Sequence, residues 1–255
     1  MGGLIVAALG LSLLAANPHG NLVDETPYER VLAKHVVDAR VDYAALKKDR
    51  AALDEYLKAV AAVRRAEYDA APKEAKIAYL LNAYNAYTLE SIVENHPIKG
   101  GFFGGANSIK GIPGVWNKKT HATALGKVTL DEIEHANLRK MGVPGVHMAL
   151  VCASKGCPPL RAEPYRADRL AAQLDDQAAA YLGSKWGLVV RGDRVKVSAI
   201  FKWFGEDFES TGGWKAFVAA NAPEETRAAV KKALESGSFE WLDYDWSLND
   251  RKGGS

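Results

Sequence analysis

A chain of 255 residues with 48% hydrophobic and 25% charged residues has the composition of a globular protein with a sizeable core. Its net charge of +2 is spread over interspersed basic and acidic residues, which excludes the clustered basic surface of a nucleic-acid-binding protein. Because no linker, repeat or low-complexity run interrupts the middle, we expect one globular domain over residues 17–250, followed by a disordered tail at 251–255.

Residues 4–16 form a nearly unbroken apolar stretch that ends in the small residues Ala15 and Ala16. The stretch is too short to span a membrane and is typical of the hydrophobic region and cleavage end of a secretory signal peptide. The charged residues that usually precede such a region are missing, so an apolar N-terminal helix packed on the protein is the alternative. We expect residues 1–16 to be signal-peptide-like. The protein would then be periplasmic or secreted, with no membrane association after signal removal.

Apolar residues recur at helical spacing in residues 28–63, 74–95, 129–141, 167–182 and 224–234. A β-hairpin is predicted at residues 188–197, turning at Gly192, and residues 239–246 are predicted as an edge segment. Residues 146–151 are predicted as a short, mostly buried strand. Together these elements predict an α+β fold, a predominantly helical single domain with a small antiparallel sheet packed on a central buried helix.

The central helix at residues 74–95 carries two amides close to its apolar face. Asn85 falls on the edge of that face and Asn82 lies further round. Since a buried amide must find hydrogen-bond partners, Asn85 either holds a neighbouring backbone or orients a catalytic base.

Thr129 and Glu132 form a capping box at the start of the helix at residues 129–141. Glu134 points inward on this helix, and His135 lies on its flank. The Glu134 carboxylate is therefore expected either in a buried ion pair or as an orienting or general-base group with a raised pKa. His135 is either a satisfied imidazole at the core edge or the base itself.

Both cysteines lie in one short segment, in which Ser154 to Gly156 break the predicted strand and Pro158 and Pro159 prevent a return to regular structure. A rigid loop at the end of a buried strand is a common position for a functional site.

Five short sequence motifs, in this order along the chain, make the sequence similar to a known family. They are residues 79–85 (YLLNAYN), 130–135 (LDEIEH), 147–152 (HMALVC), 156–160 (GCPPL), and 201–203 (FKW) together with Asp207 and Phe208. Over residues 28–217 the chain resembles the domain of unknown function 547 family. The resemblance implies no settled activity, but bacterial members of this family often look exported.

One interpretation of the polar residues is a cysteine-dependent hydrolase or acyl/amide transferase that acts on a small-molecule or peptide-like amide or ester. Cys157 is the expected nucleophile and His135 the expected base, supported by Asn85 or Glu134. The further candidates for binding the substrate are Asn82, His147, Cys152, Lys202 and Asp207.

The alternative is an exported binding or scaffold protein in which a disulfide between Cys152 and Cys157 staples the loop. His135, His147 and the two cysteines have residue types that suit zinc, but their spacing matches no standard pattern. We therefore expect neither a metal nor a cofactor.

Overall fold

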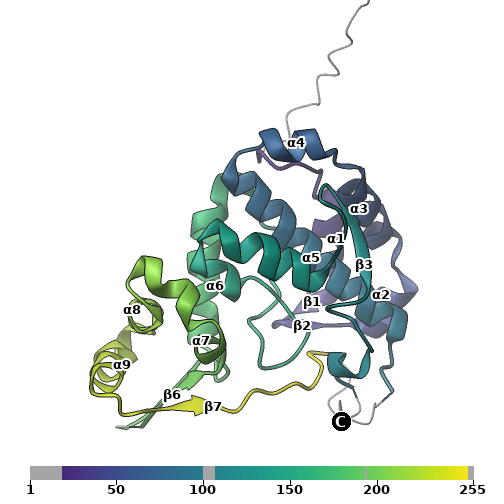
Figure 1. The fold of residues 1–255 in the computed structure, drawn as a ribbon. Coiled ribbons are helices and arrows are strands. Elements are labelled where there is room, and N and C mark those ends of the chain that lie inside the picture. The colour runs from purple at the N-terminus through teal and green to yellow at the C-terminus, as the bar shows by residue number, and fades with distance from the viewer. Residues whose placement is uncertain (1–18, 100–106, 193, 252–255) are drawn as a thin grey trace, which may run out of the picture.

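The computed structural model describes residues 19–99, 107–192 and 194–251, which form helices around one long central helix, α5 (Figure 1). The predicted signal-like segment at residues 1–16 and all but the first residue of the predicted tail lie outside the described residues. The α-helices in the described part are α1 (Thr26–His35), α2 (Tyr43–Lys48), α3 (Ala51–Ala62), α4 (Arg65–Ala70), α5 (Lys73–Asn95), α6 (Leu170–Leu182), α7 (Ile200–Trp203), α8 (Trp214–Asn221) and α9 (Glu224–Ser236). The strands are β1 (Val36–Val37), β2 (Arg40–Val41), β3 (Thr120–Thr123), β4 (Gly126–Thr129), β5 (Leu188–Arg191), β6 (Arg194–Ser198) and β7 (Phe239–Leu242). The predicted helical α+β class is confirmed.

Helix α5 is buried on almost all sides, as its apolar sequence predicts. Pro72 precedes it, where the missing backbone donor costs nothing. The Tyr79 hydroxyl donates to the Val60 carbonyl of α3 (2.9 Å) and accepts from the Ala124 N–H (2.8 Å). The Tyr87 hydroxyl donates to the Ala122 carbonyl. Two tyrosines of α5 therefore hold the antiparallel β3–β4 hairpin, and this is the small sheet on the central helix.

The predicted hairpin at 188–197 is confirmed as the antiparallel pair β5–β6, but it does not pack on α5. Strand β7 pairs with β6 in parallel, so this three-stranded sheet is mixed rather than antiparallel. Together with α7, α8 and α9 the sheet encloses a second group of buried side chains, separate from the larger group around α5. Figure 1 shows α8, α9 and strands β6 and β7 on one side of the molecule and α5 with its neighbours on the other.

The prediction of a strand at residues 146–151 is wrong. Pro144 opens a 3₁₀ helix, Pro144–Met148, and the residues after it are irregular. The burial that suggested a strand is present, because residues 146–151 are all buried. The backbone of this segment bonds to a side chain of α5 instead of to a neighbouring strand, as described below.

The capping box at Thr129 is confirmed by two hydrogen bonds. The Thr129 N–H donates to Glu132 Oε2 (2.7 Å), and the Glu132 N–H donates to Thr129 Oγ1 (3.2 Å). The turns that follow form a π-helix, Glu132–Leu138, and a 3₁₀ turn that ends at Gly142 with φ +65°. A π-helical turn is rare and often lies at a functional site, because it displaces side chains from their α-helical positions.

The C-terminal segment from β7 to Asp250 crosses from the second group of buried side chains back to the first (Figure 1). After β7, Leu248 forms an antiparallel bridge with Ser154, and Asp250 forms a parallel bridge with Val41. The Tyr43 hydroxyl donates to Asn249 Oδ1 (2.7 Å). The segment therefore ties the N-terminal helices to the cysteine loop.

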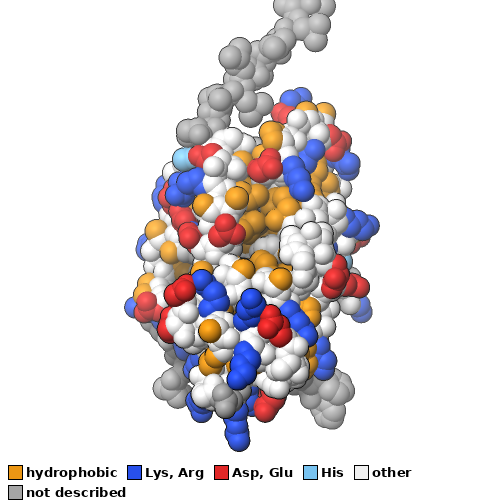
Figure 2. All heavy atoms as spheres, turned by 90° about the vertical axis from the view of Figure 1, so that its left-hand side faces the viewer, with side chains coloured by type: hydrophobic (Ala, Val, Ile, Leu, Met, Phe, Trp, Pro, Cys, Tyr) orange, Lys and Arg blue, Asp and Glu red, His pale blue; other side chains and the backbone are white. Residues whose placement is uncertain are grey.

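The face shown in Figure 2 carries Lys and Arg side chains mixed with Asp and Glu, with a hydrophobic hollow in its upper half. This mixture agrees with the near-neutral composition and gives this face no single-sign charged patch. In the described residues, every helix is too short or too polar to traverse a bilayer.

Candidate functional site

Asn82 and Asn85, one turn apart on α5, hold the backbone of the segment that carries the cysteines. Asn85 Nδ2 donates to the Ala149 carbonyl, and the Val151 N–H donates to Asn85 Oδ1, both at 3.0 Å. Asn82 makes the same pair of bonds with the carbonyl and N–H of Tyr165, both at 2.8 Å. Both amides are fully engaged with backbone, so the geometry favours the holding role for Asn85 over the orienting of a base.

The predicted disulfide between Cys152 and Cys157 is absent, because both cysteines are free. The contact between them is a hydrogen bond from the Cys152 backbone N–H to Cys157 Sγ (3.0 Å). The Cys157 thiol in turn donates to the Leu150 carbonyl (3.5 Å). The turn is thus closed by hydrogen bonds between the Cys157 thiol and the backbone. The disulfide that the scaffold interpretation predicts is not present.

The two thiols have opposite acidities. The Cys157 thiol lowers the pKa of Cys152 to about 7, with further help from the hydroxyls of Ser154 and Tyr244, each 3.1 Å from Cys152 Sγ, although burial opposes the shift. Burial raises the pKa of Cys157 well above its ordinary value, and the neighbouring Cys152 raises it further. Cys152 is therefore the thiol that ionises near neutral pH, and the thiolate is the nucleophilic form.

Cys152 lines a cavity of about 200 Å³, which we call the aromatic pocket. Its walls carry the rings of Trp116, Trp203, Phe204, Tyr244 and Trp246, and its polar lining includes Tyr84, Asp131, Glu134, His135, His147 and Cys152. Cys157, Leu150 and Ile200 complete the lining. The pocket therefore brings five of the residues predicted from the sequence, His135, Glu134, His147 and both cysteines, to one place.

Glu134 and Tyr84 form a polar pair in this pocket. The Tyr84 hydroxyl donates to Glu134 Oε2 (3.3 Å), and the Glu134 side chain is only 14% exposed. Burial raises the pKa of Glu134, partly offset by His135, whose Nδ1 lies 4.0 Å from Glu134 Oε1. A raised pKa is the property expected of this carboxyl group in a catalytic role. The His135 ring is 43% exposed and stacks on Phe204 with the ring centroids 6.3 Å apart.

The better-oriented imidazole is that of His147. Its Nε2 lies 2.7 Å from Asp207 Oδ2, and its ring stacks on Phe204 with the centroids 4.4 Å apart. Burial lowers the pKa of His147 although Asp207 opposes this, so the ring is neutral at neutral pH and its Nε2–H donates to Asp207. Within the described residues Nδ1 makes no hydrogen bond, so it is available as an acceptor.

Arg139 binds the same Asp207 carboxylate that contacts His147. Arg139 Nε donates to Asp207 Oδ2 (2.6 Å) and a terminal nitrogen donates to Asp207 Oδ1 (2.9 Å). Burial would raise the pKa of Asp207, but the bonds from Arg139 and His147 outweigh it and lower the pKa. Asp207 is thus a fixed carboxylate that orients the imidazole, as in catalytic triads.

The expected pairing of Cys157 with His135 is not found: among the described residues neither thiol is hydrogen-bonded to a histidine. Lys202 is exposed on α7 and does not line the aromatic pocket. No three His, Cys, Asp or Glu side chains in the described ranges converge on a point where they could hold a metal ion.

Several residues of the pocket were not singled out from the sequence. Tyr84 lies inside a quoted motif, but its spacing marks it only as a core position. Tyr244 and Trp246 lie in a segment predicted merely as an edge, and Arg139 is one of many surface-type residues. The one sequence signal for this pocket wall is the cluster of aromatic residues near the C-terminus.

One family model matches the chain, described as a protein of unknown function, DUF547, over residues 68–182. No curated protein and no solved structure matches the chain. The matched range contains helix α5 with both asparagines, the π-helix with Glu134 and His135, and the cysteine segment with His147. Residues 68–182 of the chain are therefore similar to the DUF547 family of proteins of unknown function.

Proposed function

We propose that this protein is a hydrolase or acyl transferase whose nucleophile is Cys152, with His147 as its base. The observation that carries the proposal is a thiol with a pKa of about 7 in a pocket shared with an Asp-oriented imidazole. Cys152 replaces Cys157 as the preferred nucleophile because the pKa of Cys157 is raised. His147 replaces His135 because Asp207 fixes its ring.

In the proposed reaction His147 Nδ1 accepts the Cys152 thiol proton, and the thiolate attacks the carbonyl carbon of an ester or amide. The bond to the alcohol or amine breaks, this group leaves with the proton from His147, and a thioester remains on Cys152. Water, or an acceptor amine or alcohol in a transferase, then attacks the thioester carbonyl carbon and gives its proton to His147. The carbon–sulfur bond to Cys152 breaks, the free acid or the new amide or ester leaves, and His147 returns the proton to the Cys152 sulfur. Tyr84 and the protonated form of Glu134 are the polar groups available to the carbonyl oxygen or the leaving group.

The walls of the aromatic pocket suggest the kind of substrate. Six Phe, Tyr and Trp rings and a volume of about 200 Å³ suit a short apolar or aromatic acyl group rather than a long chain. An amide or ester of such an acyl group is the substrate class that we propose, which includes peptide-like amides.

The first experiment is alkylation of the native protein by iodoacetamide across a pH series, with the adduct located by mass spectrometry. We expect the adduct on Cys152, with a rate that follows a pKa near 7. Cys152→Ser should abolish this adduct, while Cys157→Ser should retain it at a higher pKa, since the Cys157 thiol is the main cause of the low value.

An adduct on Cys157 alone, or a Cys152 that titrates like a free thiol, would contradict the proposal. Incubation with an activated ester then distinguishes an enzyme from a binding protein. An enzyme releases the alcohol over many turnovers, and this release should require Cys152 and be slower in His147→Gln. Saturable binding without any acyl adduct would favour a non-enzymatic binding protein.

We also propose that the protein is exported, on the basis of the apolar residues 4–16. Cell fractionation followed by N-terminal sequencing tests this directly. A mature chain that starts near Asn17 in the periplasm or medium is the expected result, and an unprocessed cytosolic chain would refute it.

A further inference from the structure

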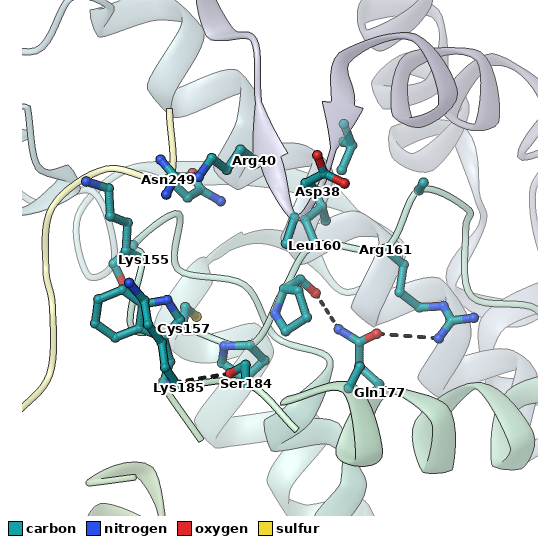
Figure 3. A pocket seen from close by; sticks show the side chains of 18 of the residues that line it. Asp38, Arg40, Lys155, Cys157, Leu160, Arg161, Gln177, Ser184, Lys185 and Asn249 are labelled. Carbon is teal, nitrogen blue, oxygen red and sulfur yellow. Dashed lines mark hydrogen bonds between the residues drawn. The ribbon is translucent and has the colours of Figure 1, made fainter. Parts of the chain in front are cut away.

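A second and larger cavity, of about 740 Å³, borders the same cysteine segment as the aromatic pocket. We call it the basic pocket, and the residues that define it here are Arg40, Lys155, Pro158, Arg161, Lys185 and Trp186. Figure 3 shows it from close by, with Lys155 and Lys185 at the end near Cys157 and Arg161 at the opposite end. Cys157 lines both cavities, whereas Cys152 and both candidate histidines line only the aromatic pocket.

Among the described residues, the lining of the basic pocket carries more cations than carboxylates. Arg161 is compensated, because its guanidinium bonds to Glu163 (2.6 Å) and lies 3.8 Å from Asp176. Glu163 in turn is also held by Arg169 (2.8 Å).

Three other cations of this pocket, Arg40, Lys155 and Lys185, form no ion pair with the described residues. The acidic groups that line the pocket are Asp38 and Glu163, and Glu163 is already paired. Within the described part of the chain, three cations and one carboxylate of the lining are therefore left without an ion-pair partner. Walls of low dielectric make such an excess attractive to an anion.

Much of the remaining lining is apolar, alongside the polar side chains of Ser154, Gln177, Ser184 and Asn249. Pro158, Pro159 and Leu160 come from the cysteine segment, and Val36 comes from β1. The half-buried Trp186 offers an indole ring, with Lys185 Nζ 4.7 Å from its centroid. The Gln177 side chain donates to the Pro159 carbonyl and accepts from Arg161 (3.4 Å), which fixes the floor. The pocket thus pairs an apolar floor and an aromatic wall with uncompensated cations.

From this geometry we propose that the basic pocket binds a small organic anion, a carboxylate or phosphate group attached to an apolar or aromatic body. The cations Arg40, Lys155 and Lys185 hold the anionic group, and Trp186 with the proline-rich floor contacts the body. The site is distinct from the proposed catalytic pocket and does not depend on Cys152 acting as a nucleophile.

The position of the pocket also makes its occupancy detectable at the other cavity. Lys155 lies between the two cysteines in the sequence, and its N–H donates to the Ser247 carbonyl (2.8 Å). Cys157, at the edge of the basic pocket, accepts the Cys152 N–H and is the main cause of its low pKa. An anion bound beside Lys155 is therefore expected to change the rate at which Cys152 is alkylated.

The test is calorimetric titration of the full chain with benzoate, phenyl phosphate, inorganic phosphate, benzyl alcohol and benzylamine as probes. We expect benzoate or phenyl phosphate to bind, with inorganic phosphate weaker because it lacks the apolar body, and benzyl alcohol and benzylamine not to bind. Whichever of the two aromatic anions binds more tightly identifies the preferred head group.

The double variant Lys155→Gln, Lys185→Gln should weaken this binding by about tenfold or more, since charge-assisted hydrogen bonds are lost. The exposed Lys58→Gln, on α3 and away from both pockets, should leave it unchanged. The proposal is overturned if no aromatic anion binds, if the double variant binds as tightly as the wild type, or if benzylamine binds equally well. Repeating the titration in Cys152→Ser separates this result from the proposed catalysis, because anion binding should persist there even if the enzyme proposal fails.

Discussion

Replacing Asn85 by Ala should lower the free energy of unfolding by about 3 kcal/mol, because two buried backbone groups lose their partner. The Ala149 carbonyl and the Val151 N–H both bond to Asn85, and Asn85 is 3% exposed, so water does not replace the amide. Denaturation by urea with linear extrapolation measures the change. The same substitution should loosen the segment that carries Cys152, which the pH profile of alkylation reports.

Asn95→Ala on the same helix is the matched control. Its Nδ2 also donates to a backbone carbonyl, that of Ser91 (2.8 Å), but the residue is exposed in the last turn of α5. Water can take its place, so we expect a change within about 0.5 kcal/mol. If Asn85→Ala lowered the free energy of unfolding as little as Asn95→Ala, the cysteine segment would be held by something other than the Asn85 side chain.

Asp207→Ala is expected to lower the free energy of unfolding by about 3 kcal/mol, since its removal leaves the half-buried Arg139 charge without its bidentate partner. Arg139 would lose a bidentate carboxylate and the buried His147 ring would lose its acceptor. Under the proposed function the variant should also slow acylation of Cys152, because the imidazole is no longer oriented. Because the pKa of Asp207 in the folded protein lies below its ordinary 3.8, its own stabilising contribution is present above about pH 4 and is lost as the pH falls through the folded value.

Glu206→Ala is the control that removes a second carboxylate partner of Arg139 without removing the contact to His147. Glu206 bonds to the same Arg139 (3.1 Å), but its side chain is 80% exposed. A surface pair of this kind contributes little, so the free energy of unfolding should stay within about 0.5 kcal/mol of the wild type. Equal losses in the Asp207 and Glu206 variants would show that the buried chain from Arg139 to His147 has no special role.

Local patterns in the sequence predict the parts of the fold that local forces decide. Helix α5 follows from its apolar spacing and from Pro72, the capping box follows from Thr129 and Glu132, and the β5–β6 hairpin follows from its glycine turn. The β3–β4 hairpin was missed because its residues carry little apolar alternation, and it is held by tyrosines of α5 instead.

The strand predicted at residues 146–151 fails for a different reason. Burial on both sides produces the same run of apolar residues in a strand and in an irregular segment. What decides between them is the partner of the backbone, and here that partner is Asn85, more than sixty residues earlier in the chain. The rule that a buried amide needs partners was right about Asn85, but no local pattern names a partner so distant.

For the site, the sequence predicts the residue types but not their pairing. The pocket contains His135, His147, Glu134 and both cysteines, as expected from their motifs. The choice between Cys152 and Cys157 depends on which thiol Ser154 and Tyr244 contact, and Tyr244 lies 92 residues from Cys152. The orienting carboxylate, Asp207, was singled out only as a binding residue, because its distance from His147 in space is not visible in the sequence.

The C-terminal segment has a consequence for the order of folding. Helices α1 to α5 can form from contacts that are close in the sequence, whereas the bridges of Ser154 to Leu248 and of Val41 to Asp250 close loops of roughly one hundred to two hundred residues. Tyr244, which acidifies Cys152, and Trp246, which walls the pocket, arrive with those late contacts. An intermediate in refolding would thus regain helical circular dichroism before it regains a reactive thiol, and the lag between the two signals would time the docking of the last segment.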